Sequence, residues 1–292
     1  MKVSCNIGMI KHLVGEEKSI SLIADAGFDA IDMGFDDAEN GPYGRWLKDD
    51  YSVQSRELLA RVRDHGLYFN QAHAPLTPET LGTVGPDVLN NVRFDYFERF
   101  FLVCSLLEIP HVVVHNLSNP VFSRNPEHKF LVNLEFYRRL KTLAEPYGVR
   151  IALENLYLHL SGTESFAQML DALDDDYFMA CVDVGHSNMV NQDTGELIRR
   201  IGSKVQALHV HDNHVEYDEH LIPGMGKMDW NSVLQALADV NYSGDFTLEV
   251  GSHACGCLGT HQGFEPDFLP HVMKFTQKSA RYLADRLESM KK

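Results

Sequence analysis

The sequence predicts an α/β protein with a (β/α)8 TIM-barrel fold. Apolar, β-branched runs alternate with helix-period segments eight times along the chain. The chain has 292 residues, and a barrel of this kind needs about 250 residues plus extensions. No stretch rich in Gly, Pro or Ser divides the sequence, so we expect a single domain over residues 1–292. The main alternative is a doubly wound sheet, which the same alternation can also produce.

The expected strands are short and mostly apolar, as buried parallel strands are. They cover residues 3–8, 30–35, 68–74, 111–117, 149–156, 178–186, 205–213 and 245–250. A helix is expected after each strand, and the first two end at glycines, a common helix stop. The helices cover residues 18–27, 52–66, 87–109, 126–148, 163–173, 194–204, 229–240 and 266–290.

The bulk composition limits the classes of function. Hydrophobic residues make up 44% of the chain and charged residues 23%, as in ordinary globular proteins. We see no apolar run long enough to cross a bilayer, no secretion signal, and five cysteines, an odd number that does not suggest a disulfide framework. These features predict a cytoplasmic protein without a membrane partner, and they leave a homo-oligomer open. The net charge of −15 disfavours nucleic acid as a partner, because such proteins need a basic surface.

Side chains that can bind a metal stand at one end of six consecutive strands. They are His73, His115, Glu154, Asp183, His186, His209, Asp212 and Glu249. The C-terminal ends of barrel strands share one rim, where active sites are built. A single histidine there is more often structural than a ligand, but clustered carboxylates without cationic partners would be costly. Only Arg150 lies within the third to eighth strands, so the pattern predicts a divalent cation.

Seven short motifs occur in order along the chain, almost one for each strand. They are "QAHAP" (71–75), "VVVH" (112–115), "IALEN" (151–155), "VDVGH" (182–186), "LHVHD" (208–212), "HLIPGMGKMDW" (220–230) and "TLEV" (247–250). Together they resemble the xylose isomerase-like TIM barrels, in the sugar phosphate isomerase/epimerase branch that shares its fold with endonuclease IV. The resemblance runs from about residue 70 to residue 250.

The resemblance implies a set of site residues. In the ketose epimerases of this family, one divalent ion, commonly Mn²⁺, is held by residues that match Glu154, Asp183, His209 and Glu249. The two glutamates also act as acid and base, and His186 matches a histidine that contacts substrate. Zn²⁺, Mg²⁺ and Co²⁺ are the alternative ions. The chain differs from these epimerases at Leu160, where they have a glutamate, and at Val215, where they have an arginine.

The stretch "HVHDNHVEYDEH" (209–220) leaves two interpretations open. Endonuclease IV holds three zinc ions with nine ligands, and this chain offers a candidate for each, with Asp218 and His220 as part of the third site. The net charge disfavours that nuclease. We therefore expect Asp218 and His220 to shape a substrate pocket, with His73, His115 and His186 also facing the substrate. His211 and His214 stay unassigned.

These residues predict a metal-dependent isomerase or epimerase that removes a proton next to the carbonyl of a sugar or polyol. Proton removal gives an enediolate, which a divalent ion can stabilise. Glu154 and Glu249 are the expected acid and base. A lyase or dehydratase on a keto-polyol or sugar conjugate begins with the same step and is the first alternative, and a non-enzymatic sugar-binding protein is another. The loops after the seventh and eighth strands contain one lysine, Lys227, and no arginine, which favours a non-phosphorylated substrate.

Overall fold

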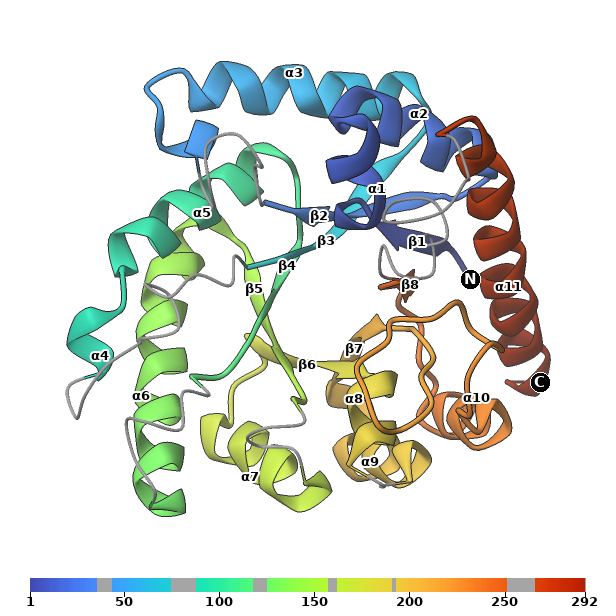
Figure 1. The fold of residues 1–292 in the computed structure, drawn as a ribbon. Coiled ribbons are helices and arrows are strands. Elements are labelled where there is room, and N and C mark those ends of the chain that lie inside the picture. The colour runs from blue at the N-terminus through green and yellow to red at the C-terminus, as the bar shows by residue number, and fades with distance from the viewer. Residues whose placement is uncertain are drawn as a thin grey trace.

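The computed structural model describes residues 1–35, 44–74, 88–117, 125–156, 162–190, 193–250 and 266–291. Its eight strands are parallel and lie in one sheet in the order β7-β6-β5-β4-β3-β2-β1-β8. A parallel bridge between Val210 and Leu248 brings the two ends of this order together and nearly closes the ring. Figure 1 shows the strands at the centre with helices around them. The predicted (β/α)8 barrel is confirmed, because a doubly wound sheet would stay open.

All eight predicted strands are present. They are β1 (Val3–Asn6), β2 (Ala30–Gly34), β3 (Tyr68–His73), β4 (His111–Val114), β5 (Arg150–Glu154), β6 (Phe178–Asp183), β7 (Val205–His209) and β8 (Phe246–Leu248). Each ends one to four residues before the predicted C-terminal limit. The clearest case is β6, where Asp183 accepts a hydrogen bond from the His186 backbone and starts a helix instead of continuing the strand.

The helices lie outside the ring of strands. They are α1 (Gly8–Val14), α2 (Glu16–Ala26), α3 (Tyr51–Asp64), α4 (Val88–Asn91), α5 (Phe94–Leu106), α6 (Pro126–Ala144), α7 (Thr163–Leu173), α8 (Val184–Met189), α9 (Thr194–Ile201), α10 (Trp230–Asp239) and α11 (Leu269–Met290). Helix α2 ends at Gly27, whose φ of 94° is the left-handed conformation that glycine adopts readily. Helix α11 lies beside the N-terminus (Figure 1), and Arg281 donates a hydrogen bond to the Met1 carbonyl.

Three parts of the helix prediction differ from the structure. The segment expected as one helix over 87–109 is two helices, because Arg93 has a ψ of 72° that interrupts the helix. Residue 87 itself lies outside the described residues. Helices α1 and α8 were not predicted; both are short, α1 starting two residues after the end of β1 and α8 directly after β6. Among the described residues, no helix combines the length and apolar character that a bilayer span requires.

The inside of the barrel is filled in two ways. Small or slender side chains form an apolar cluster of Val113, Ala152, Met179, Cys181 and Ala207. Beside it lies a buried polar chain in which Ser4 donates to Asn70 (2.6 Å) and Asn70 donates to Thr247 (2.8 Å). Each polar side-chain atom of these three residues has a hydrogen-bond partner, so the interior can be polar without a large desolvation cost. This filling supports the rim on which the predicted site residues stand.

His111, at the other end of the barrel, predicts a pH dependence of stability. Its Nε2 is buried without a hydrogen-bond partner among the described residues, and burial lowers its pKa from the usual 6.5 to about 4. Between pH 6.5 and pH 4 the unfolded chain protonates this ring and the folded chain does not, so stability falls as pH falls. Between pH 6.5 and pH 4, the unfolding free energy of the wild type should fall by up to about 3 kcal/mol more than that of His111→Gln. Urea unfolding of both proteins at pH 7 and pH 4 measures this; parallel pH dependences would contradict it.

Candidate metal centre

The four residues predicted as metal ligands converge at one rim of the barrel. Ligand atoms of Glu154, Asp183, His209 and Glu249 all lie within 4.8 Å of one another. They stand at or just beyond the C-terminal ends of β5, β6, β7 and β8. The first three are fully or almost fully buried, whereas the Glu249 side chain is 18% exposed. Glu249 is thus the carboxylate of this group that a molecule in the barrel mouth reaches most easily.

The His209 ring lies between the two glutamates. Its Nδ1 is 3.1 Å from Oε1 of Glu154 and 3.2 Å from Oε2 of Glu249. Burial alone would raise the pKa of Glu154, but the His115 and His209 imidazoles hold the pKa of this carboxyl well below its usual range. Glu154 is therefore an ionised carboxylate in a buried site.

Asp183 is fixed from several sides. The Asn155 side chain accepts from the Asp183 backbone N–H and donates to its carbonyl, both at 2.8 Å. The Asp183 carboxylate accepts from the backbone N–H of His186 at 2.6 Å and has Nε2 of His211 at 3.0 Å. Burial raises the pKa of Asp183, yet the imidazoles of His186 and His211 lower it overall. The backbone and the carboxylate are thus both held in place.

Two predicted substrate-binding histidines lie next to Glu154. Nε2 of His115 is 2.7 Å from Oε2 of Glu154, and Nε2 of His73 is 3.0 Å from Nε2 of His115. Ligand atoms of these three residues lie within 4.8 Å of one another. Both rings are partly exposed, so they can face a molecule bound at the rim.

The remaining predicted substrate-binding residues gather on the other side of Asp183. Oδ2 of Asp218 is 3.2 Å from Nε2 of His186 and 3.1 Å from Nε2 of His220. His220 stacks on His211 with ring centroids 4.1 Å apart. Burial lowers the pKa of His220, but Asp218 and Glu249 raise it to about 9. His186, His211, Asp218 and His220, the His186 group, also have ligand atoms within 4.8 Å of one another. This group and the group of His73, His115 and Glu154, the His73 group, are each compact enough to hold an ion.

Asp212 fixes the loop that carries Asp218 and His220. One of its oxygens accepts from the backbone N–H groups of Asn213 (2.9 Å) and Met228 (3.0 Å). The other accepts from Gly224 N–H (2.9 Å) and Trp230 Nε1 (3.1 Å). The carboxylate is fully buried, so both ends of the loop depend on an acceptor with two oxygens.

We expect Asp212→Asn to lower the free energy of unfolding by about 2–4 kcal/mol. The new amide group would face two N–H donors and leave both unsatisfied in a buried place. Asp229→Asn is the matched control, because Asp229 caps α10 through a single oxygen and asparagine caps helices equally well. Chemical denaturation of the two variants measures the difference. Equal stabilities would show that the loop does not depend on the Asp212 carboxylate.

The donor set fits a divalent ion. Three carboxylates and one imidazole supply oxygen-rich ligands, which suit a six-coordinate ion such as Mn²⁺ better than a structural zinc site rich in sulfur. About two coordination positions would remain for a substrate. The short distances between these carboxylates support the fit, because buried carboxylates this close repel one another unless positive charge lies between them.

Sequence reasoning did not assign three residues of this region. Asp32 lies 3.5 Å from His209 through their Oδ2 and Nε2 atoms; a lone carboxylate in the apolar run "AIDMGF" was the available signal. The other two, His211 and Asp212, lie within the metal-rich stretch itself. His214 points to Glu219 instead (2.8 Å). Leu160 lies outside the described residues, and Val215 adopts a φ of 84°, unusual for a β-branched residue.

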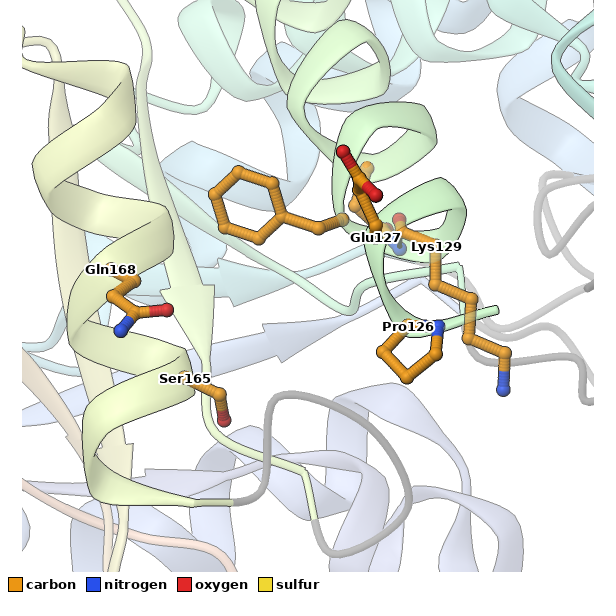
Figure 2. A pocket seen from close by; sticks show the side chains of 7 residues that line it. Pro126, Glu127, Lys129, Ser165 and Gln168 are labelled. Carbon is orange, nitrogen blue, oxygen red and sulfur yellow. Dashed lines mark hydrogen bonds between the residues drawn. The ribbon is translucent and has the colours of Figure 1, made fainter. Parts of the chain in front are cut away.

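A separate cavity lies between α6 and α7. Its volume is about 370 Å³, and Figure 2 shows its lining, which includes Glu127, Lys129 and Gln168. None of the residues predicted for the site lines it. We therefore place the candidate site at the carboxylate cluster of Glu154, Asp183, His209 and Glu249 and not in this cavity.

Comparisons with known proteins agree with this architecture. A D-psicose 3-epimerase of Ruminiclostridium cellulolyticum is 24% identical over 257 residues, which cover 83% of this chain and 80% of that protein. The crystal structure of D-psicose 3-epimerase with D-tagatose from Clostridium cellulolyticum H10 superposes with a TM-score of 0.76 at 19% identity, covering 97% of this chain and 99% of that one. The IolI protein with a bound zinc atom gives a TM-score of 0.73 at 18% identity, with 98% of each chain covered.

The family model of the xylose isomerase-like TIM barrels matches residues 20–284, which include every strand from β2 to β8 and all the residues of the carboxylate cluster. The chain therefore belongs to the xylose isomerase-like TIM barrel family.

Proposed function

We propose that this protein is a divalent-metal-dependent isomerase or epimerase of a sugar or sugar derivative. The observation that carries the proposal is the convergence of Glu154, Asp183, His209 and Glu249 within 4.8 Å at the barrel mouth. The relative that shares 24% identity is a D-psicose 3-epimerase, which supports chemistry on a ketose. We assign the four residues as ligands of one ion, Mn²⁺ above all, and treat residues 1–292 as one catalytic domain.

The reaction begins at a C–H group next to a carbonyl. When bound, the ion would polarise that carbonyl and stabilise the negative charge that develops on the substrate. Glu154 and Glu249 come from β5 and β8, which stand about 135° apart around a ring of eight strands. One glutamate removes the proton and the other returns it on the opposite face, which inverts the carbon. Return by the same glutamate to the adjacent carbon, together with transfer of the hydroxyl proton to the former carbonyl oxygen, gives isomerisation.

The two glutamates are not equivalent. Glu154 is buried and contacted by His115, whereas Glu249 is partly exposed to the mouth. We assign Glu249 as the base that meets the substrate first. His73, His115, His186, His220 and Asp218 then surround the sugar and bind its hydroxyl groups, each bond contributing on the order of 1 kcal/mol.

One observation favours a second candidate, an endonuclease IV-like hydrolase of abasic DNA. The His73 group and the His186 group each have the spacing of an ion site, so three ions would have ligands. The net charge of −15 opposes DNA binding. We therefore rank this function below sugar chemistry.

The test is turnover of a panel of ketoses and keto-inositols by ion-loaded protein in D₂O. We expect a new epimer or isomer that carries deuterium at the reacting carbon, detected by NMR after the ion is removed. A keto-polyol that loses water instead would favour the lyase alternative, and nicking of an abasic duplex without any sugar turnover would favour the hydrolase. Asp183→Asn serves as the inactive control, because it removes a proposed ligand charge.

A further inference from the structure

The two nitrogens of His209 face different surroundings. Nδ1 faces the carboxylates of Glu154 and Glu249 at 3.1 and 3.2 Å. An ion held by these carboxylates would therefore meet His209 at Nδ1. A neutral imidazole that gives its Nδ1 lone pair to a metal carries its proton on Nε2. This buried N–H then needs a hydrogen-bond acceptor.

A candidate acceptor lies on β2, on the far side of the ring. Nε2 of His209 is buried and has no hydrogen-bond partner among the described residues, and Oδ2 of Asp32 lies 3.5 Å from it. Asp32 is 0% exposed, and its Oδ1 also has no partner in the described part of the chain. A buried ring nitrogen without a partner and a buried carboxylate with one unpartnered oxygen thus stand just beyond ordinary hydrogen-bond distance.

Asn6 holds the Asp32 carboxylate in place. Its Nδ2 donates to Oδ2 of Asp32 at 3.0 Å, and its own Oδ1 accepts from the backbone N–H of Gly8 at 2.7 Å. A buried carboxylate that receives one amide hydrogen bond is costly unless a further charged or N–H partner compensates it. The neighbouring strand residues Ile31 and Met33 are apolar and offer no such partner.

We propose that Asp32 is a positioning residue for the metal centre: it accepts the Nε2–H of His209 and so fixes the ring with Nδ1 toward the ion. A shift of about half an ångström brings the pair to ordinary hydrogen-bond distance. The carboxylate strengthens His209 as a ligand because it polarises the imidazole. Asp32 itself touches neither ion nor substrate. This inference rests on the proposed metal-dependent function.

The test compares Asp32→Asn with Asp245→Asn. Both variants remove one carboxylate from the strand region, but Asp245 lies at the opposite end of the barrel, where it accepts a hydrogen bond from Tyr68 at 2.6 Å. We expect Asp32→Asn to weaken Zn²⁺ and Mn²⁺ binding about 10–100-fold in competition with a chelator. Asp245→Asn should bind as the wild type does, and Asp32→Asn should regain most of its kcat at saturating ion. Equal ion affinities in folded Asp32→Asn and wild type would overturn the assignment.

A second measurement covers the case in which Asp32→Asn does not fold. Wild-type protein with ¹⁵N-labelled histidine and bound Zn²⁺ should show a slowly exchanging Nε2–H on His209, with Nδ1 bound to the metal. A His209 that binds Zn²⁺ through Nε2 would overturn the inference about Asp32 while leaving the metal centre intact. Wild-type protein that binds no divalent ion would overturn the proposed function and this inference together.

Discussion

Glu249→Gln is expected to abolish turnover while the fold and the bound ion are retained. Glutamine keeps an oxygen that can ligate weakly, but it cannot accept a proton at neutral pH. We expect kcat to fall at least about 10²–10⁴-fold, the usual contribution of a positioned acid or base. The measurement is kcat at saturating ion, together with the metal content of the purified variant.

Glu135→Gln is the control for this substitution. Glu135 lies on the exposed surface of α6, where it pairs with Arg139, so its loss should leave kcat unchanged. Full activity of Glu249→Gln with its ion in place would remove Glu249 from proton transfer. The chemistry would then have to be assigned to Glu154 alone.

Removal of the divalent ion is expected to eliminate activity completely, and re-addition of Mn²⁺ should restore it. Without an ion, the carboxylates of Glu154, Asp183 and Glu249 have no shared cation with which to bind a sugar carbonyl. Protein saturated with Zn²⁺ and then dialysed should retain about one ion per chain, and Asp183→Asn should retain almost none. Elemental analysis combined with the turnover assay measures both.

The same analysis separates the single-ion site from a three-ion centre. Asp218→Ala should leave the ion content near one, because we assign Asp218 to the substrate pocket. A content near three that falls selectively in Asp218→Ala would show that the His186 group is a metal site. Cleavage of an abasic duplex by that protein would then replace sugar chemistry as the proposed function.

Much of the fold could be predicted because buried parallel strands leave a clear pattern. The eight strands follow from apolar runs, and glycine at position 27 marks the end of α2. The strand ends were placed too late because the residues after them, such as the segment 184–186, are buried at the rim and still resemble strand. Helix α8 depends on a cap that Asp183 makes only when it stands at the mouth, which a linear pattern does not display.

The candidate site was predictable where chemistry and position coincide. Glu154 and Asp183 are charged residues directly at strand ends, and the structure brings them together as expected. Asp32 was missed because it lies in the middle of an apolar strand and gains its meaning only from the ring of His209 on the other side of the barrel. His211 was left unassigned because its contact with Asp183, at 3.0 Å, joins segments 28 positions apart.

The ring of strands meets itself beside two of the proposed ligands. Val210 donates to the Thr247 carbonyl at 2.9 Å, and Glu249 donates to the Val210 carbonyl at 3.1 Å, so His209 and Glu249 stand on either side of the seam between the last two strands. An ion bound by both residues would hold β7 and β8 together at this junction. At a free ion concentration of 100 times its Kd, it would add about 2.7 kcal/mol to the stability of the closed barrel. Binding of the ion and completion of the fold would then be a single event, because a chain in which β7 and β8 have not paired has no assembled ion site.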